Sequence, residues 1–261
     1  MCVIRFKTER EIEIIKQSSL IVGKTLAEVA KIINPGVRSK TIEKVAEEFI
    51  RDNGGIPSFK GYRGFPAAVC ISVNDVVVHG IPSQYEFRDG DIVAVDCGVK
   101  KNGFHADYAY TFLLGNVPDA VRKLCERTKE SLYLGIEQAK AGNRVGDVSF
   151  AIQSYVEKHG YSVVREMIGH GIGRNIHEKP DVPNYGNKGN GARLKRGMVF
   201  CIEPMINLGR KEIRTDRDGW TTRTIDGMPS AHYEHMVAIR ENGTEVLSTY
   251  QYVEDILESK K

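Results

Sequence analysis

The sequence predicts an α+β fold in which helices cover one face of a curved antiparallel sheet. Two helical segments precede a run of extended segments, and this order then occurs a second time. The 261 residues are 41% hydrophobic and 27% charged and contain no linker or low-complexity run, which is typical of a globular unit with a sizeable core. We expect a single domain over 1–261, built of two pseudo-symmetric halves at about 1–115 and 116–261.

The first half begins with two helices. Thr8 and Glu11 have the spacing of a capping box, and helically spaced apolar residues follow until Pro35-Gly36. A second helix is expected from about Lys40 to Asn53, before Gly54-Gly55. The extended segments 67–73, 91–99 and 104–114 come next, and the turn residues Asn102-Gly103 indicate that the last two form a hairpin.

The second half repeats this order. One helix is expected from Pro118 to about Ala141 and another from Gly146-Asp147 to Gly160. Strands are then expected at 161–169, 197–208, 219–225, 232–240 and 244–250. The stretch 168–180, "IGHGIGRNIHEKP", contains too many glycines for a helix and is interpreted as strand and loop.

The composition excludes several classes of protein. A net charge of +3 is too small for a nucleic-acid protein with a concentrated basic face, and no apolar run is long enough to span a membrane. The five cysteines are scattered, and three lie in apolar runs, so we expect buried thiols rather than disulfides. The charged start lacks the apolar core of a signal peptide. A cytoplasmic protein is therefore expected.

Acidic residues interrupt segments that otherwise indicate buried strands. Asp96, Asp107, Glu203 and Glu234 lie in "IVAVDCGV", "FHADYAYTFLL", "MVFCIEPMI" and "HYEHMVAI". An unpaired carboxylate in an apolar interior costs several kcal/mol. Pairing with Arg or Lys, or location at a strand end, explains any one of them. A shared cation is the simpler explanation for all four.

Four carboxylates and one histidine would form an oxygen-rich site suited to Mn, Fe, Co or Zn. Four negative charges balance two divalent ions. Two ions roughly 3.5–4 Å apart can hold a bridging water or hydroxide and polarise a carbonyl, which is the equipment for metal-assisted hydrolysis.

Six strings make the interpretation specific: "VHGIP", "VDCGVKKNGFHADYAYTF", "GHGIGRNIHEKP", "FCIEPM", "DGWTTRT" and "AHYEH". Together, and in order over nearly the whole chain, they resemble the type I methionine aminopeptidases in their minimal, bacterial-style form. The resemblance implies the pita-bread fold, one catalytic domain with a dinuclear metal centre between its halves. It also implies removal of the initiator methionine from nascent proteins.

The resemblance also assigns roles by position. Asp96 would chelate one ion, Asp107 and Glu234 would bridge both, and His170 and Glu203 would complete the ligands of the second ion. His177 would hydrogen-bond the scissile carbonyl oxygen, with the glycines placing its ring and that of His170 on either side of the cleft. The further catalytic residues would be His79, which contacts the substrate or shuttles a proton, and Glu203, which handles the proton of the attacking water.

The pocket for the methionine side chain is implied at Tyr62, Phe65, Cys70 and Trp220, although "GYRGFPAAVC" could simply be a packed loop. Phe59 and Ile176 would also line it. Many relatives have a cysteine at the first of these positions and an aromatic residue at the second. Cys97 is expected to be a core residue rather than a nucleophile.

Asn74, Val76 and Ser230 match a monovalent-cation loop, for Na or K, in some relatives. Expected partners are nascent polypeptide N-termini, the ribosome through a weak basic patch, and no membrane or sequence-specific nucleic acid; the protein is expected to be a monomer. Two alternatives remain: a proline-specific aminopeptidase or dipeptidase of the same fold, and a non-catalytic binding relative. The latter loses metal ligands, whereas all five positions are filled here.

Overall fold

The computed structural model describes residues 3–260. Two helices followed by strands occur twice along the chain, and a further helix lies near its end. The helices are α1 Glu9–Ile32, α2 Ser39–Asp52, α3 Asp119–Gln138, α4 Val145–Lys158 and α5 Gln251–Ser259, with a 3₁₀ turn at Tyr62–Gly64. The strands of the first half are β1 Ile56–Pro57, β2 Cys70–Val73, β3 Val76–Val78, β4 Ile92–Lys101 and β5 Phe104–Leu113. Those of the second half are β6 Ser162–Val163, β7 Gly169–Gly171, β8 Glu178–Val182, β9 Val199–Ile202, β10 Met205–Asn207, β11 Ile213–Thr215, β12 Thr222–Thr224, β13 Ser230–His232, β14 His235–Arg240 and β15 Gly243–Val246.

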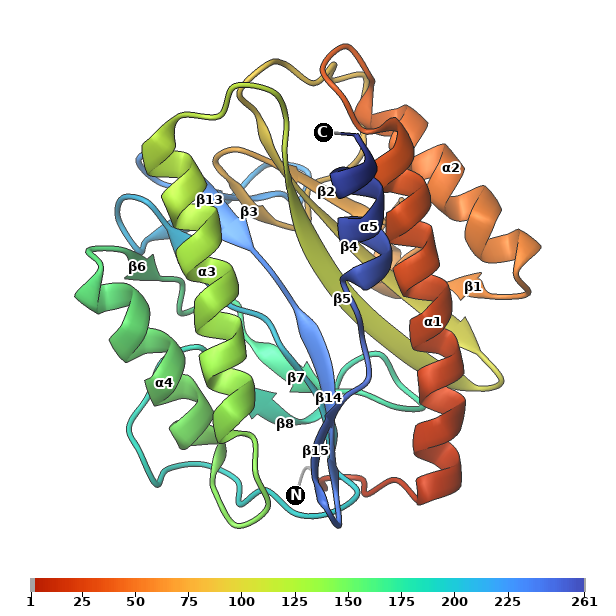
Figure 1. Cartoon of the computed structure of the whole chain (residues 1–261), viewed down its shortest axis with the longest axis vertical. Helices are drawn as coiled ribbons and strands as arrows, with labels where there is room; N and C mark the ends of the chain where they lie inside the picture. Colours follow the sequence, from red (N-terminus) through yellow and green to blue (C-terminus); the bar gives the residue numbers. More distant parts are fainter. Residues whose placement is uncertain (1–2, 261) are drawn as a thin grey trace.

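The helices pack on strands that pair antiparallel wherever pairing is recorded in the described chain. Helices α1 and α5 lie together over β4 and β5, while α3 and α4 form a pair on the other side of the molecule (Figure 1). Strands β1, β2, β4 and β5 form one sheet, and β15-β14-β9-β7-β8 form another. Of the two shorter sheets, β13-β10-β6 lies within the second half, whereas β11-β12-β3 joins two strands of the second half to β3 of the first. The α+β class is confirmed.

Helix α1 begins where its sequence predicts. The Thr8 side chain accepts from the Glu11 backbone N–H, and the Glu11 carboxylate accepts from the Thr8 N–H, so the capping box satisfies donors at the first turn. The apolar residues Ile12, Ile15 and Leu26 are fully buried. Burial of this stripe against β4 and β5 fixes the helix on the sheet.

The β4–β5 hairpin places two acids on one face. Asn102 and Gly103 have φ of 52° and 83°, the left-handed pair that a two-residue turn needs to match strand twist. In the resulting register Asp96 lies opposite Ala109, and Asp107 lies opposite Gly98. Side chains alternate faces along a strand, so both carboxylates project from the same side as diagonal neighbours.

Three segments expected to be single strands each change sheet partway. Segment 161–169 divides into β6 and β7, 197–208 into β9 and β10, and 232–240 into β13 and β14. Glu203 and Glu234 lie in the short breaks between these strands, not inside strands as the sequence suggested. Pro204 lacks the N–H that a continuous ladder would need at the first of these breaks. The charged pair Arg165-Glu166 lies in the break within 161–169.

Other boundaries also differ from expectation. Helix α3 ends at Gln138 rather than near Ala141, and β4 continues to Lys101. The expected strand 244–250 ends at Val246, and α5 follows it unforeseen. Only Val253 of this nine-residue helix is fully buried, although Val253, Ile256 and Leu257 have helical spacing. In the described chain, no helix is long and apolar enough to cross a membrane. The four described cysteines are free and buried, and Cys2 lies outside the described residues.

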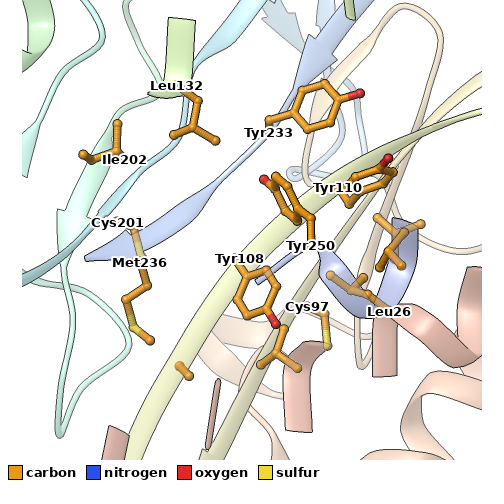
Figure 2. Close-up of a cluster of buried hydrophobic side chains, with 14 of the residues drawn as sticks. Leu26, Cys97, Tyr108, Tyr110, Leu132, Cys201, Ile202, Tyr233, Met236 and Tyr250 are labelled. Carbon is orange, nitrogen blue, oxygen red and sulfur yellow. The ribbon is translucent and has the colours of Figure 1, made fainter. Parts of the chain in front are cut away.

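A buried aromatic cluster packs Tyr250, the residue before α5, against β5 and β14. Figure 2 shows Tyr250 close to Tyr110 and Tyr108, and its ring also stacks on His235 with centroids 4.0 Å apart. The Tyr250 hydroxyl lies 2.7 Å from the Ala109 carbonyl and 2.8 Å from the Glu234 carbonyl, and it accepts the Glu234 N–H at 3.0 Å. This hydroxyl therefore ties the β13–β14 break to β5.

We expect Tyr250→Phe to lower the free energy of unfolding by about 1–3 kcal/mol, because the buried Glu234 carbonyl then loses its hydroxyl donor. Urea unfolding followed by circular dichroism measures the change. Tyr252→Phe is the matched control: this tyrosine is half-buried in the same helix, and no hydrogen bond of its hydroxyl is recorded among residues 3–260. Equal stability of the two variants would contradict the role given to the Tyr250 hydroxyl.

Candidate metal centre and adjoining pocket

The four acids and the two histidines of 168–180 line one cavity. Its volume is about 280 Å³, and its walls come from both halves of the chain. Asp96 and Asp107 project from the β4–β5 hairpin, His170 from β7, and Glu203 and Glu234 from the two breaks between strands. The five side chains that the sequence predicted as metal ligands therefore lie together, although they are up to 138 positions apart (96 to 234).

The acids are buried beside histidines rather than beside lysine or arginine. His170 Nε2 lies 3.6 Å from Glu203 Oε1 and 4.0 Å from Asp107 Oδ2. Asp107 and Glu234 are 3% and 2% exposed. These spacings are longer than hydrogen bonds, but they suit neighbouring ligands of a common ion.

Ligand atoms within 4.8 Å of one another form three groups. Asp96, Asp107 and Glu234 form one; Glu203, His232 and Glu234 form the second; His170, Cys201 and Glu234 form the third. Glu234 belongs to all three, as a carboxylate shared by two ions would. Burial raises the pKa of the Cys201 thiol well above its usual range, which opposes the thiolate that a cysteine ligand requires.

The cluster is incomplete without a cation. Among the described residues, one oxygen of each acid is buried without a hydrogen-bond partner, namely Asp96 Oδ1, Asp107 Oδ1, Glu203 Oε1 and Glu234 Oε1. Unpaired buried carboxylate oxygens are costly, and divalent ions satisfy such oxygens. The residues present therefore fit a divalent-metal centre.

Proton affinities in the cluster show the same need for positive charge. Burial raises the pKa of Asp96 to about 7 and raises the pKa values of Asp107, Glu203 and Glu234 well above their usual range. The mutual repulsion of the carboxylates adds to the effect for the last three. Without metal these acids hold protons near neutral pH.

The loop carrying His177 is held from two sides. The ring centroids of His177 and His170 are 4.2 Å apart. The two rings are therefore in contact and do not lie on either side of the cleft as expected. The Tyr62 hydroxyl lies 2.9 Å from His177 Nδ1. Next to it, the buried Lys7 ammonium donates to Glu178 at 2.8 Å, an ion pair that ties the segment before α1 to this loop.

The glycines around His170 allow the neighbouring strands to pack closely against β7. A Cβ on Gly169 would lie 2.5 Å from the Cys201 carbonyl oxygen, and one on Gly171 would lie 2.3 Å from that of Lys179. Neither glycine has a positive φ. They therefore allow β8 and β9 to approach β7 closely, with His170 between them.

His79 lines the same cavity and has a strained backbone conformation. Its φ is 58°, in the left-handed region that costs a non-glycine residue about 1–2 kcal/mol. The following Gly80 is required, since a Cβ there would be 2.2 Å from the Ile71 carbonyl oxygen. The His79 ring meets Trp220 edge-on, with centroids 6.2 Å apart.

An apolar pocket adjoins the acids. Its side chains pack as one cluster separate from the main core and comprise the buried Phe59, Phe65, Ala67, Cys70 and Ile176, with Tyr62, Ile81 and Trp220 against them. All six residues predicted for the methionine pocket belong to this cluster, but only Phe59, Tyr62, Phe65, Cys70 and Trp220 line the cavity, whereas Ile176 does not. Phe65 contacts Trp220 edge-on at 5.2 Å, so aromatic faces and edges form its wall.

The residues predicted to bind a monovalent cation are neighbours, but two of them, Asn74 and Ser230, are hydrogen-bonded to each other. The Asn74 carbonyl accepts from the Ser230 N–H at 2.9 Å, and the Asn74 side chain bonds Asp91 and the Ile92 N–H. Val76 lies just beyond, in β3. A cation there stays a prediction. Cys97 is fully buried, as expected, and burial raises the pKa of its thiol, which opposes a nucleophilic role.

His232 is a cavity residue that the sequence did not predict. This residue ends β13 and lines the same cavity, 4.0 Å from Glu203 and from Glu234. It precedes Glu234 by two residues, the interval that places strand side chains on one face, so the signal was available in "AHYEH".

Because metal must displace protons from these acids, we expect binding of Mn²⁺ at pH 7 to release about one proton or more per centre. Calorimetric titration in two buffers of different ionisation enthalpy measures this number. His170, whose pKa burial lowers to about 4, is already neutral and contributes none. Carboxylates with ordinary pKa values would release no protons at pH 7, so a buffer-independent heat would contradict the raised values.

Comparison with known proteins gives a consistent family. The model of metallopeptidase family M24 matches residues 13–241. The chain is 50% identical to a methionine aminopeptidase of Clostridium perfringens, over 94% of this chain and 99% of that one. The crystal structure of the Thermotoga maritima methionine aminopeptidase superposes with a TM-score of 0.93 at 42% identity, covering 95% of this chain and 100% of that one. A prolidase of Pyrococcus furiosus is more distant, with a TM-score of 0.76 and 26% identity over 94% of this chain and 65% of that one. The chain thus belongs to metallopeptidase family M24, among its methionine aminopeptidases.

Proposed function

We propose that this protein removes the N-terminal methionine from nascent proteins and peptides whose second residue is small. One observation carries the proposal: the acid-lined centre and the aromatic pocket share a single cavity of about 280 Å³. A hydrolytic centre beside a slot for one side chain suits cleavage after a first residue. The near full-length match to methionine aminopeptidases supports methionine as that residue.

The metal centre is proposed to use Asp96 on one ion, Asp107 and Glu234 between two ions, and His170 with Glu203 on the other. Divalent ions bound there would polarise the scissile carbonyl and activate water for attack. Asp96 and Asp107 come from the first half of the chain and the others from the second. We therefore propose that 1–261 acts as one catalytic domain whose halves, about 1–115 and 116–261, meet at the centre.

His177 is proposed to stabilise the oxyanion. Burial, followed by the neighbouring His170, lowers the pKa of His177 to about 3, so its ring is neutral at pH 7. If the Tyr62 hydroxyl donates to Nδ1, the proton of the ring resides on Nε2, ready to donate to the carbonyl oxygen as charge develops on it. Tyr62 would thus select the tautomer that His177 needs.

Glu203 and His79 are proposed to handle protons and substrate. Burial and the nearby acids raise the pKa of Glu203, which favours taking a proton from water and passing it to the leaving amine. Burial lowers the pKa of His79, so it is neutral near the scissile amide. Its ring lines the cavity that contains the acids and contacts Trp220 of the apolar cluster, which supports this role.

The methionine side chain is proposed to occupy the cluster of Phe59, Tyr62, Phe65, Cys70, Ile176 and Trp220. A thioether there gains apolar burial and modest sulfur–aromatic contacts. The bulk of Phe59 lines this slot next to Gly98 of β4, and Ile176 packs in the same cluster without lining the cavity.

The remaining assignments are also proposals: Co, Mn, Fe or Zn as the metal, Na or K at Asn74, Val76 and Ser230, a cytoplasmic monomer, and a ribosome contact.

A proline-specific enzyme is the second candidate. This chain spans 65% of the compared prolidase, against 99% of the compared methionine aminopeptidase, which favours the first. Chelator-stripped protein given each metal in turn should cleave a Met-Gly-type peptide and not an Xaa-Pro peptide. The reverse preference would overturn the proposal.

Asp96→Asn should empty one metal position and abolish turnover, because an amide replaces the carboxylate that balances the ion's charge. Metal content after gel filtration and the rate on a Met-Gly-type peptide are the measurements. Circular dichroism should stay unchanged, since the two side chains have the same size. Normal metal content with normal turnover would exclude Asp96 as a ligand.

His177→Ala should lower kcat by roughly 10²–10³ with metal content unchanged, as for loss of one oxyanion donor. Tyr62→Phe should give a smaller loss of the same kind, because the ring of His177 keeps its place but loses its partner. If His177→Ala instead releases metal, the roles of His170 and His177 are exchanged.

A further inference from the structure

His232 is fixed by its backbone so that its ring enters the cavity. Its N–H donates to the Thr111 hydroxyl, which in turn donates to the His232 carbonyl, and its Cα pairs with Met205 across β10. The residue is 2% exposed, and Nε2 is buried with no hydrogen-bond partner among the described residues. An unpartnered ring nitrogen in a closed site is costly unless something binds it.

The distances around this nitrogen are those of a ligand atom. Nε2 lies 4.0 Å from Glu203 Oε2 and 4.0 Å from Glu234 Oε2, too far for hydrogen bonds. Ligands that bind one ion at about 2.0–2.2 Å stand roughly 3–4 Å from each other. His170 has the same relation to its acids, at 3.6 and 4.0 Å.

We propose that His232 is a sixth metal-binding residue, its Nε2 ligating an ion together with Glu203 and Glu234. The proposal rests on the metal centre of the proposed function and adds an imidazole that the resemblance does not include. A dinuclear centre with two imidazoles is richer in nitrogen, which favours Zn, Fe or Co over Mn. The donor set, and with it the metal preference, would be a property of this chain.

X-ray absorption of protein loaded with two equivalents of Zn²⁺ tests the proposal. The native protein should show about one imidazole per ion, from His170 and His232, and His232→Gln about half that number. Calorimetry of the same proteins should show a loss of Zn²⁺ affinity of roughly 10- to 100-fold or more in His232→Gln. Mn²⁺ affinity should fall less.

The matched control is His105→Gln. His105 is a buried histidine whose Nδ1 is already partnered by Ser58 and which does not line the cavity. It should leave the imidazole number and the affinity unchanged. An unchanged imidazole number in His232→Gln, or about half an imidazole per ion in the native protein, would overturn the proposal and leave His232 a positioning residue. These readouts do not involve peptide cleavage, so failure to cleave a Met-Gly-type peptide would overturn the proposed function alone.

Discussion

The burial of four carboxylates in one small cavity is the constraint on which the rest of the structure depends. Their neighbours are each other and histidines, so near neutral pH they either hold protons or face a cation. If all four were ionised with no cation present, they would repel one another. The fold must therefore fix each carboxylate through its backbone, and it does so from several directions.

Each acid has its own support. The left-handed Asn102-Gly103 turn sets the register that brings Asp96 and Asp107 to one face. The Tyr250 hydroxyl holds the backbone of Glu234 against β5, and the Asn184 side chain donates to the Glu203 carbonyl. Around His177 the Lys7–Glu178 pair provides a similar anchor. None of these supports touches a metal, yet each determines where a ligand or donor lies.

Sequence patterns among residues a few positions apart predicted many of the helices, turns and site residues. The capping box, the helical apolar spacing and the Asn-Gly turn depend on residues a few positions apart, so they could be identified in the sequence. The conflict between acidic residues and apolar strands identified the centre for the same reason. Strand changes between sheets could not be foreseen, because they depend on which distant strand pairs with each half of a segment. The contact between the rings of His170 and His177, and the arrival of Tyr250 beside Glu234, likewise depend on tertiary packing.

The short breaks at Glu203 and Glu234, between β9 and β10 and between β13 and β14, separate the strand register of one sheet from that of the next. Within a continuous strand, a shift of one residue turns every following side chain to the other face. Here the alternation starts anew on each side of the acid, because β9 and β14 belong to one sheet while β10 and β13 belong to another. Each sheet can therefore accumulate substitutions and adjust its packing without reversing the other, and the ligand between them keeps its orientation.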